Sequence, residues 1–157
     1  MHIAVLDDNI ADRKQLERLL DRESDRRIQT TGNLYIDSYG SVDALMLAPK
    51  KQYDFFLIDL KGPVFDSVKI INDLLAQGIQ VPICLMRSEN ELEGTDKPEG
   101  LLYIEKPIRV ADLTAVIDKA LEIKKVKDEE KVIENIKQWE EELSAKRSKG
   151  LFGKLFK

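Results

Sequence analysis

The sequence predicts an α/β fold, namely a doubly wound, five-stranded parallel sheet followed by a C-terminal helical extension. Apolar runs of strand length alternate with amphipathic segments of helical period, which favours parallel strands joined by helical crossovers. Two of the runs are almost entirely apolar, which is typical of strands buried on both faces. The composition agrees, because 43% hydrophobic and 34% charged residues over 157 positions indicate a globular chain.

Five apolar runs are expected to form the strands. The alternation of Leu34 and Ile36 places the second run at an edge of the sheet, whereas the third and fourth runs fit central positions. Polar groups follow the carboxyl ends of several runs, and this pattern fits the strand order 2-1-3-4-5 of flavodoxin-like sheets. The five runs are residues 2–6, 33–38, 53–58, 81–86 and 101–104.

Four segments are expected to form helices. Asp8 or Asn9 can cap the first, and the second ends near Pro49. Between the fourth and fifth strands, Leu92 is the only large apolar residue of segment 87–100, so we expect a short helical turn or a mobile loop there. The helical segments are residues 10–23, 41–47, 66–77 and 109–121.

Several classes of protein are excluded by composition. A single cysteine, Cys84, and a single histidine, His2, allow neither a disulfide framework nor a Cys/His zinc site. No apolar stretch approaches membrane-spanning length, and the first residues lack the pattern of a signal peptide. We therefore expect a protein of the reducing cytoplasm.

Charge is divided unevenly along the chain. Residues 1–123 carry 15 basic and 22 acidic side chains, a net charge of −7, whereas residues 124–157 carry 10 and 7, a net charge of +3. An acidic body with a basic end predicts a domain and an appendage. The expected boundaries are a domain over 1–122, a helical extension over 123–147 and a basic tail over 148–157.

Three carboxylates follow the ends of predicted neighbouring strands. Asp7 and Asp8 come after the first strand, and Asp59 ends the third. In the expected strand order they converge at one edge of the sheet, where their repulsion needs a counter-charge. Hard oxygen ligands suit Mg²⁺, and Lys106 after the fifth strand suits a phosphoryl oxygen. The alternative is that these acids are helix caps and solvated loop residues.

Four motifs together resemble the receiver domain of two-component response regulators, of the stand-alone, chemotaxis-regulator kind. The resemblance covers residues 2–122, and its motifs are VLDDN (5–9), LIDLKGPVFDS (57–67), VPICLM (81–86) and YIEKPI (103–108).

The resemblance implies a role for each matching position. Asp59 would accept a phosphoryl group from the phosphohistidine of a partner kinase or phosphotransfer protein. Asp7 and Asp8 would hold Mg²⁺ together with Asp59 and the backbone carbonyl of Lys61. Lys106 would pair with Asp59 or with its phosphoryl group. Tyr103 matches the switch aromatic of the family. Such a domain is a signalling module rather than an enzyme, and it assists only its own phosphoryl transfer.

The sequence departs from the family at the switch position after the fourth strand. Receivers have threonine or serine there, but counting from Pro82 the position is Arg87, and a slip of one residue would supply Ser88 instead. Arg87 could pair with Asp59 or with phosphoryl oxygens as a bidentate donor. It would then either sense the phosphoryl group directly or mimic the neutralised state and fix one conformation; the alternative is that it points into solvent. In the loop after Asp59, Gly62 and Ser67 replace the usual methionine and glycine.

These observations predict a single-domain response regulator that accepts phosphate on Asp59 and signals by contact with a downstream protein. The alternative is a pseudo-receiver, a binding or scaffold module that never uses phosphate. A haloacid-dehalogenase-type phosphatase is a further rival, but Asp7-Asp8 lacks the spacing of its DxD motif. Nucleic acid is not expected as a partner, because the body is acidic and the tail is too short for a helix-turn-helix.

The C-terminal extension is expected to be helical, because residues 122–147 contain no glycine or proline. Val132, Ile136, Trp139 and Leu143 recur at 4-3-4 spacing, which makes two heptads of an apolar seam. Three alternatives stay open for this seam: it forms a homodimer, docks on the receiver, or binds a partner protein.

The last twelve residues, 146–157, carry five positive charges and no acid. A basic amphipathic end predicts attachment to a membrane surface, which would place the protein peripherally at the membrane, or binding in a partner's groove. The alternative is a frayed terminus. The apolar side chains on one face are Leu151, Phe152, Leu155 and Phe156.

Overall fold

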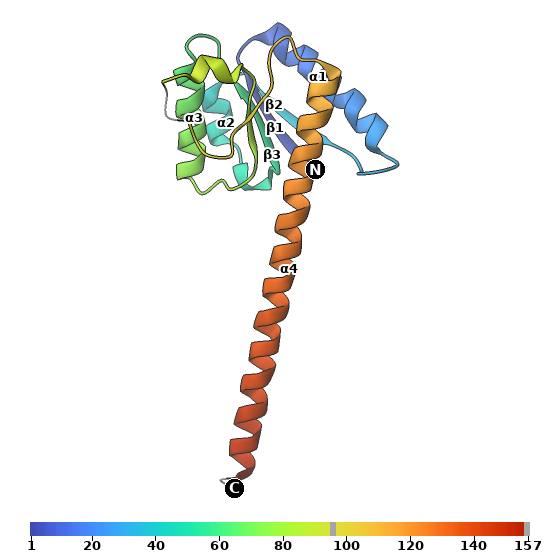
Figure 1. The fold of residues 1–157 in the computed structure, drawn as a ribbon, viewed down its shortest axis with the longest axis vertical. Coiled ribbons are helices and arrows are strands. Elements are labelled where there is room, and N and C mark those ends of the chain that lie inside the picture. Colours follow the sequence, from blue (N-terminus) through green and yellow to red (C-terminus); the bar gives the residue numbers. More distant parts are fainter. Residues whose placement is uncertain (95–96, 156–157) are drawn as a thin grey trace. The chain divides into compact units, whose positions relative to one another are not determined.

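Five parallel strands form one sheet in the order β2-β1-β3-β4-β5, which confirms the predicted fold class (Figure 1). The structure is a computed structural model that describes residues 1–94 and 97–155, with the side chains described as far as residue 150. The strands are β1 (His2–Asp7), β2 (Tyr35–Tyr39), β3 (Phe55–Asp59), β4 (Ile83–Leu85) and β5 (Leu102–Tyr103).

The register of the central strands aligns two of the predicted site residues. β1 pairs with β2 on one side and with β3 on the other. The last pair of the β1–β3 ladder joins Asp7 to Asp59. Because the strands are parallel, their carboxyl ends lie at the same edge of the sheet, and both acids lie at that edge.

Alternating side chains of the sheet build two cores, one on each face. Ala4 and Phe56 contribute to the core beneath α2 and α3, whereas Ile3 and Phe55 contribute to the core beneath α1 and the first turns of α4 (Figure 1). This double coverage explains why β3 is buried at every position. The helices are α1 (Ile10–Arg27), α2 (Val42–Leu47), the 3₁₀ turn η1 (Lys50–Gln52), α3 (Val64–Ala76), the 3₁₀ turn η2 (Glu89–Leu92) and α4 (Val110–Leu155).

The N-termini of the first two helices are capped by side chains. Asn9, rather than Asp8, caps α1, because its Oδ1 accepts the backbone N–H of Asp12 at 3.0 Å. Ser41 caps α2 by accepting the N–H of Ala44 at 3.2 Å. Each cap satisfies a backbone donor that the first helical turn leaves without a partner.

Helix α1 continues one turn beyond the predicted end, to Arg27. The added turn carries a buried ion pair, in which Arg27 Nε lies 3.0 Å from Glu23 Oε2. The other oxygen of Glu23 accepts a hydrogen bond from Thr114 of α4 at 2.6 Å. A sequence pattern of apolar spacing does not find this turn, because charged side chains form its buried face.

The segment after β4 contains a short helical turn, as the sequence predicts. β4 and β5 have three and two residues, and the described residues between them, 86–94 and 97–101, form the 3₁₀ turn η2 and no full helix. Leu92 anchors η2 in the core, with 3% of its surface exposed. The described part of this segment therefore has little regular structure.

The chain divides into two compact units, Met1–Leu121 and Glu122–Lys157, and α4 continues through the division. In the second unit, Val132, Ile136 and Trp139 are each exposed by about half or more, and Leu143 is partly buried. The side chains of Leu151, Phe152 and Leu155, and all of Phe156, lie outside the described residues.

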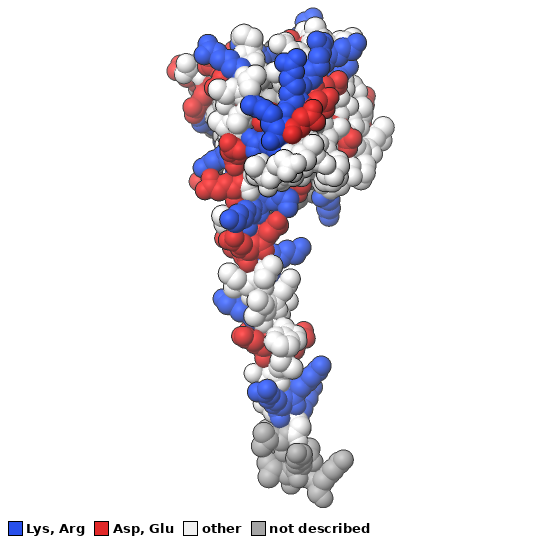
Figure 2. All heavy atoms as spheres, turned by 90° about the vertical axis from the view of Figure 1, so that its right-hand side faces the viewer, with Lys and Arg blue, Asp and Glu red and all other residues white. Residues whose placement is uncertain are grey.

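Both signs of charge lie side by side on the face of the molecule shown in Figure 2, which is typical of a solvated surface. Among the described residues, no helix combines the length and apolarity needed to cross a bilayer.

Candidate functional site

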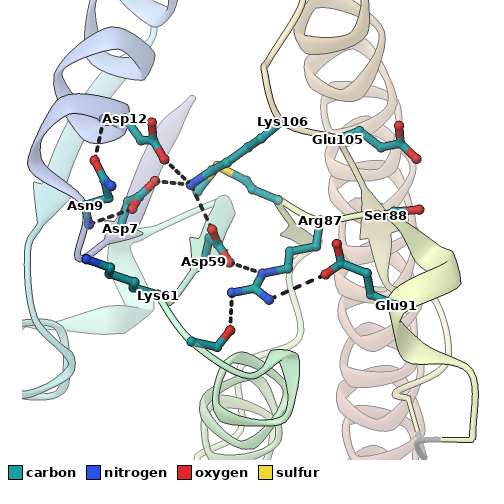
Figure 3. Close-up of a pocket in the computed structure, with 12 residues that line it drawn as sticks. Asp7, Asn9, Asp12, Asp59, Lys61, Arg87, Ser88, Glu91, Glu105 and Lys106 are labelled. Atoms are coloured by element: carbon teal, nitrogen blue, oxygen red, sulfur yellow. Dashed lines mark hydrogen bonds and ion pairs between the residues drawn. The ribbon is translucent and has the colours of Figure 1, made fainter.

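A cavity of about 570 Å³ opens at the carboxyl edge of the sheet, where β1 and β3 end (Figure 3). The loops after β4 and β5 complete its wall. Charged side chains predominate in the lining, which consists of Asp7, Asn9, Asp12, Asp59, Lys61, Gly62, Met86, Arg87, Ser88, Glu91, Glu105 and Lys106.

The ammonium group of Lys106 lies among three carboxylates. Its Nζ is 2.8 Å from Asp7 Oδ2, 2.8 Å from Asp59 Oδ2 and 3.0 Å from Asp12 Oδ2. These acids come from β1, β3 and the first turn of α1, so Lys106 ties three elements together (Figure 3). The repulsion expected from the sequence is thus offset in part by a partly buried cation.

The guanidinium of Arg87 binds the same aspartate from the opposite side. Its Nε lies 2.9 Å from Asp59 Oδ1, and its Nη2 donates to the backbone carbonyls of Leu60 at 2.5 Å and Gly62 at 2.7 Å. Its Nη1 lies 3.5 Å from Glu91 Oε2. The side chain of Arg87 is only 18% exposed, so the structure does not place it in solvent. Both oxygens of Asp59 therefore have a cationic partner.

These contacts favour the charged forms of both cations. Burial by itself would lower the pKa of Lys106, but its hydrogen bonds with Asp59, Asp7 and Asp12 raise that pKa above the ordinary value. Burial likewise opposes the charge of Arg87, and the pairing with Asp59 outweighs it and raises the pKa of the guanidinium.

The carboxyl group of Asp7 responds differently, since its side chain is almost fully buried. Burial raises the pKa of Asp7, and the hydrogen bonds from Lys106 and from the N–H of Asn9 only partly offset this.

Asp8 is not part of this cluster in the structure. It is exposed, and its Oδ1 accepts the backbone N–H of Lys61 at 2.6 Å. Asp12 occupies the third acidic position instead, and the sequence analysis did not single it out. Its signal was an acid in the first turn of the helix that follows Asp7, where a side chain points back toward the strand end.

The donor chemistry of this edge fits a divalent cation. Carboxylate oxygens of Asp7, Asp8 and Asp59 are the hard ligands that Mg²⁺ prefers. Within the described residues, however, no group of three or more histidine, cysteine, aspartate or glutamate side chains is arranged to hold a metal ion. Since Asp59 already pairs with Lys106 and Arg87, a metal ion bound there would share the carboxylate with these cations or displace one of them.

The other two positions considered for the switch lie away from Asp59. Ser88 caps η2, where its Oγ accepts the N–H of Asn90 at 3.3 Å, and it is Arg87 that reaches the acceptor. Tyr103 lies on β5, with Lys97 Nζ 5.6 Å from its ring centroid. Its buried hydroxyl has no hydrogen-bond partner among the described residues.

Ser67, in the first turn of α3, is a further residue near Asp59 whose contact the sequence did not reveal. It is fully buried, and its Oγ accepts the backbone N–H of Leu60 at 2.9 Å. The serine that replaces the family's glycine therefore fixes the backbone directly after Asp59.

Solved structures with this fold are response regulator receiver domains in many cases. The two component transcriptional regulator AraC from Clostridium phytofermentans superposes with a TM-score of 0.60 at 20% identity, covering 78% of this chain and 93% of that one. The receiver domain of a Francisella response regulator gives a TM-score of 0.54 at 20% identity, covering 78% and 98%. The domain thus has the receiver fold.

Two curated proteins are similar in sequence. They are the transcriptional regulatory proteins PrrA of Mycobacterium tuberculosis and of Mycobacterium bovis, each 28% identical over 96 residues. The match covers 58% of this chain and 40% of each relative, so the chain matches about two fifths of their length. No family model matches the sequence.

Proposed function

We propose that this chain is a receiver module of two-component signalling that accepts a phosphoryl group on Asp59. The supporting observation is the position of this carboxylate. It lies at the carboxyl end of a central strand, its side chain is 8% exposed in a polar cavity, and Lys106 Nζ is 2.8 Å from its Oδ2. The receiver-like fold and the similarity to PrrA point the same way.

In the proposed reaction, a carboxylate oxygen of Asp59 attacks the phosphorus of a phosphohistidine on a kinase or phosphotransfer protein. The new P–O bond forms as the P–N bond breaks, and the imidazole leaves and takes up a proton from solvent. Lys106 offsets the negative charge of the transferring group, and little other catalytic machinery is needed. Mg²⁺ held by Asp7, Asp8, Asp59 and the carbonyl of Lys61 would neutralise phosphoryl oxygens.

A second candidate function is a pseudo-receiver, which would bind or scaffold partners without phosphate. The observation that favours it is the ion pair between Arg87 and Asp59, because an arginine already neutralises the acceptor carboxylate. Such a pair would hold the domain in one conformation.

The output of either module would be contact with a downstream protein. Val132, Ile136 and Trp139 in the second unit offer exposed apolar side chains to a second copy of the chain or to a partner helix. The basic residues that follow add attraction for an acidic partner or an anionic membrane surface of the cytoplasm.

The test is phosphorylation in solution. The full chain is incubated with Mg²⁺ and acetyl phosphate, and separately with beryllofluoride, with Asp59→Asn as the control and Lys106→Ala as a second variant. We expect a mass increase of one phosphoryl group that is absent in Asp59→Asn and slower to form in Lys106→Ala. If neither reagent gives an adduct that depends on Asp59, the phosphoacceptor role is wrong and the pseudo-receiver remains.

A further inference from the structure

Arg87 connects two parts of the first unit, the loop after Asp59 (residues 60–63, the acceptor loop) and the turn η2. One end of its guanidinium binds Asp59 and the two carbonyls of the acceptor loop, and the other faces Glu91 of η2. Figure 3 shows the side chain lying across the mouth of the acceptor loop, on the side of Asp59 opposite Lys106. A planar guanidinium is suited to hold several acceptors at once, which an ammonium group cannot match.

We propose that Arg87 is an internal counter-cation that competes with a divalent metal ion for Asp59, and that its displacement loosens η2. The regulatory meaning of this inference rests on the proposed phosphoacceptor role of Asp59, whereas the competition itself concerns only the metal ion. Arg87 then acts as a positioning residue that keeps the acceptor closed until the metal ion and phosphoryl group replace it.

The two cations occupy the two different oxygens of Asp59. Arg87 Nε occupies Asp59 Oδ1, and Lys106 occupies Oδ2. Arg87 Nη2 binds the carbonyls of Leu60 and Gly62, the residues on either side of Lys61. A metal ion held by Asp59 and the Lys61 carbonyl would therefore bind the same aspartate and the same short loop as the guanidinium.

Repulsion between the two cations favours exchange over joint occupancy. Arg87 Nε lies 2.9 Å from Asp59 Oδ1, so a divalent ion on Asp59 would lie close to a guanidinium of the same sign of charge. The ion therefore binds more easily once Arg87 has moved away.

The same side chain connects the acceptor to the surface formed by η2. Ser88 caps η2, Glu91 pairs with Arg87, and Leu92 is the buried anchor of the turn. When Arg87 leaves Asp59, the acceptor loop and η2 lose their shared partner. This connection takes the place of the hydroxyl group that receivers carry after the fourth strand.

The competition is tested with Mg²⁺ alone, in the absence of a phosphoryl donor. Isothermal titration calorimetry of the full chain is compared with Arg87→Met, which keeps the length of the side chain and removes its charge. We expect Arg87→Met to bind Mg²⁺ at least tenfold more tightly. Arg18→Met is the matched control, because Arg18 is an exposed residue of α1 that does not line the cavity, and it should leave the affinity unchanged.

Equal or weaker Mg²⁺ binding by Arg87→Met would overturn the proposal. Circular dichroism checks that the variant is folded, and Arg87→Gln, which is uncharged but polar, replaces it if it is not. Arg87→Lys keeps the charge and loses the fork of donors, so its affinity should lie between the wild type and Arg87→Met.

The link to η2 has its own readout. In amide NMR spectra, we expect Mg²⁺ to shift Ser88–Leu92 in the wild type and to leave them nearly unshifted in Arg87→Met, where the link is already broken. Equal shifts in both proteins would refute the coupling. If Asp59 is never phosphorylated but Arg87→Met still gains Mg²⁺ affinity, the phosphoacceptor role fails and the competition stands. If Asp59 is phosphorylated but Arg87→Met gains no Mg²⁺ affinity, the phosphoacceptor role stands and the competition fails.

Discussion

The acceptor edge of the sheet and the segment from Arg87 to Tyr103 are built very differently. β1 and β3 pair over five residues, every position of β3 is buried, and the acids at their ends are held by partners from several elements. The segment from Arg87 to Tyr103 follows the three-residue strand β4, and its described residues form the 3₁₀ turn η2, anchored by Leu92, and the two-residue strand β5.

This difference separates a rigid chemical site from a surface that can rearrange. Asp59 is preorganised, because the strand that carries it is packed on both faces and neighbouring cations hold both of its oxygens. The segment after β4 has few buried contacts, so its local unfolding should cost less free energy. Arg87 spans the two, and a change at Asp59 can reach η2 through it.

The largest expected effect comes from the core under the acceptor strand. Phe56→Ala removes a fully buried ring between β3 and the helices α2 and α3, and should lower the free energy of unfolding by about 3–5 kcal/mol. Urea denaturation measures it. Phe65→Ala is the control, because Phe65 is 62% exposed and should change stability by less than about 0.5 kcal/mol. A small loss for Phe56→Ala would break the contrast between the two sides.

A smaller effect is expected at the anchor of η2. Leu92→Ala removes its buried side chain and should cost about 2–3 kcal/mol. Amide hydrogen exchange should accelerate in Ser88–Leu92 much more than in β3, because the anchor holds one local segment. Equal acceleration in both regions would show that they unfold as one unit. Leu47→Ala, at an 88% exposed position, should leave exchange unchanged.

The smallest effect compares two tyrosines. Tyr53 Oη donates to Asp37 Oδ2 at 2.7 Å and accepts from Tyr39, so Tyr53→Phe should cost about 1 kcal/mol. The hydroxyl of Tyr103 has no partner among the described residues, so Tyr103→Phe should leave stability unchanged or raise it slightly. Urea denaturation of both variants measures the change in the free energy of unfolding. A comparable loss of stability in Tyr53→Phe and Tyr103→Phe would contradict the comparison.

The same tyrosine gives a pH dependence. Burial raises the pKa of Tyr53 above its ordinary value of 10, and the contacts with Tyr39 and Asp37 add to this. A raised pKa in the folded state contributes stability that is complete below pH 10 and is lost as pH rises through the folded value. The stability difference between wild type and Tyr53→Phe should therefore shrink above pH 10, and a constant difference would refute the shift.

Much of this architecture was predictable from local patterns. Apolar runs located the five strands, and the polar groups at their carboxyl ends indicated the strand order 2-1-3-4-5. The predicted helices match α1, α2 and α3 to within a few residues. The position of Asp7, Asp59 and Lys106 at one edge followed from the strand order alone. The turn of α1 around Glu23 and Arg27 was missed, because its buried face is an ion pair and apolar periodicity does not detect that.

The sequence by itself determined the fold class, the acidic strand ends and the unusual arginine after the fourth strand, because each depends on residue type and on spacing along the chain. Only the tertiary structure decided which side chains share the cavity. It replaced Asp8 with Asp12 in the group around Lys106, and it turned Arg87 inward to Asp59. These contacts depend on the direction in which individual side chains point where the loops after the strands meet. Several carboxylates and carbonyls compete there for the donors of Lys106 and Arg87, and this competition is not visible in the sequence.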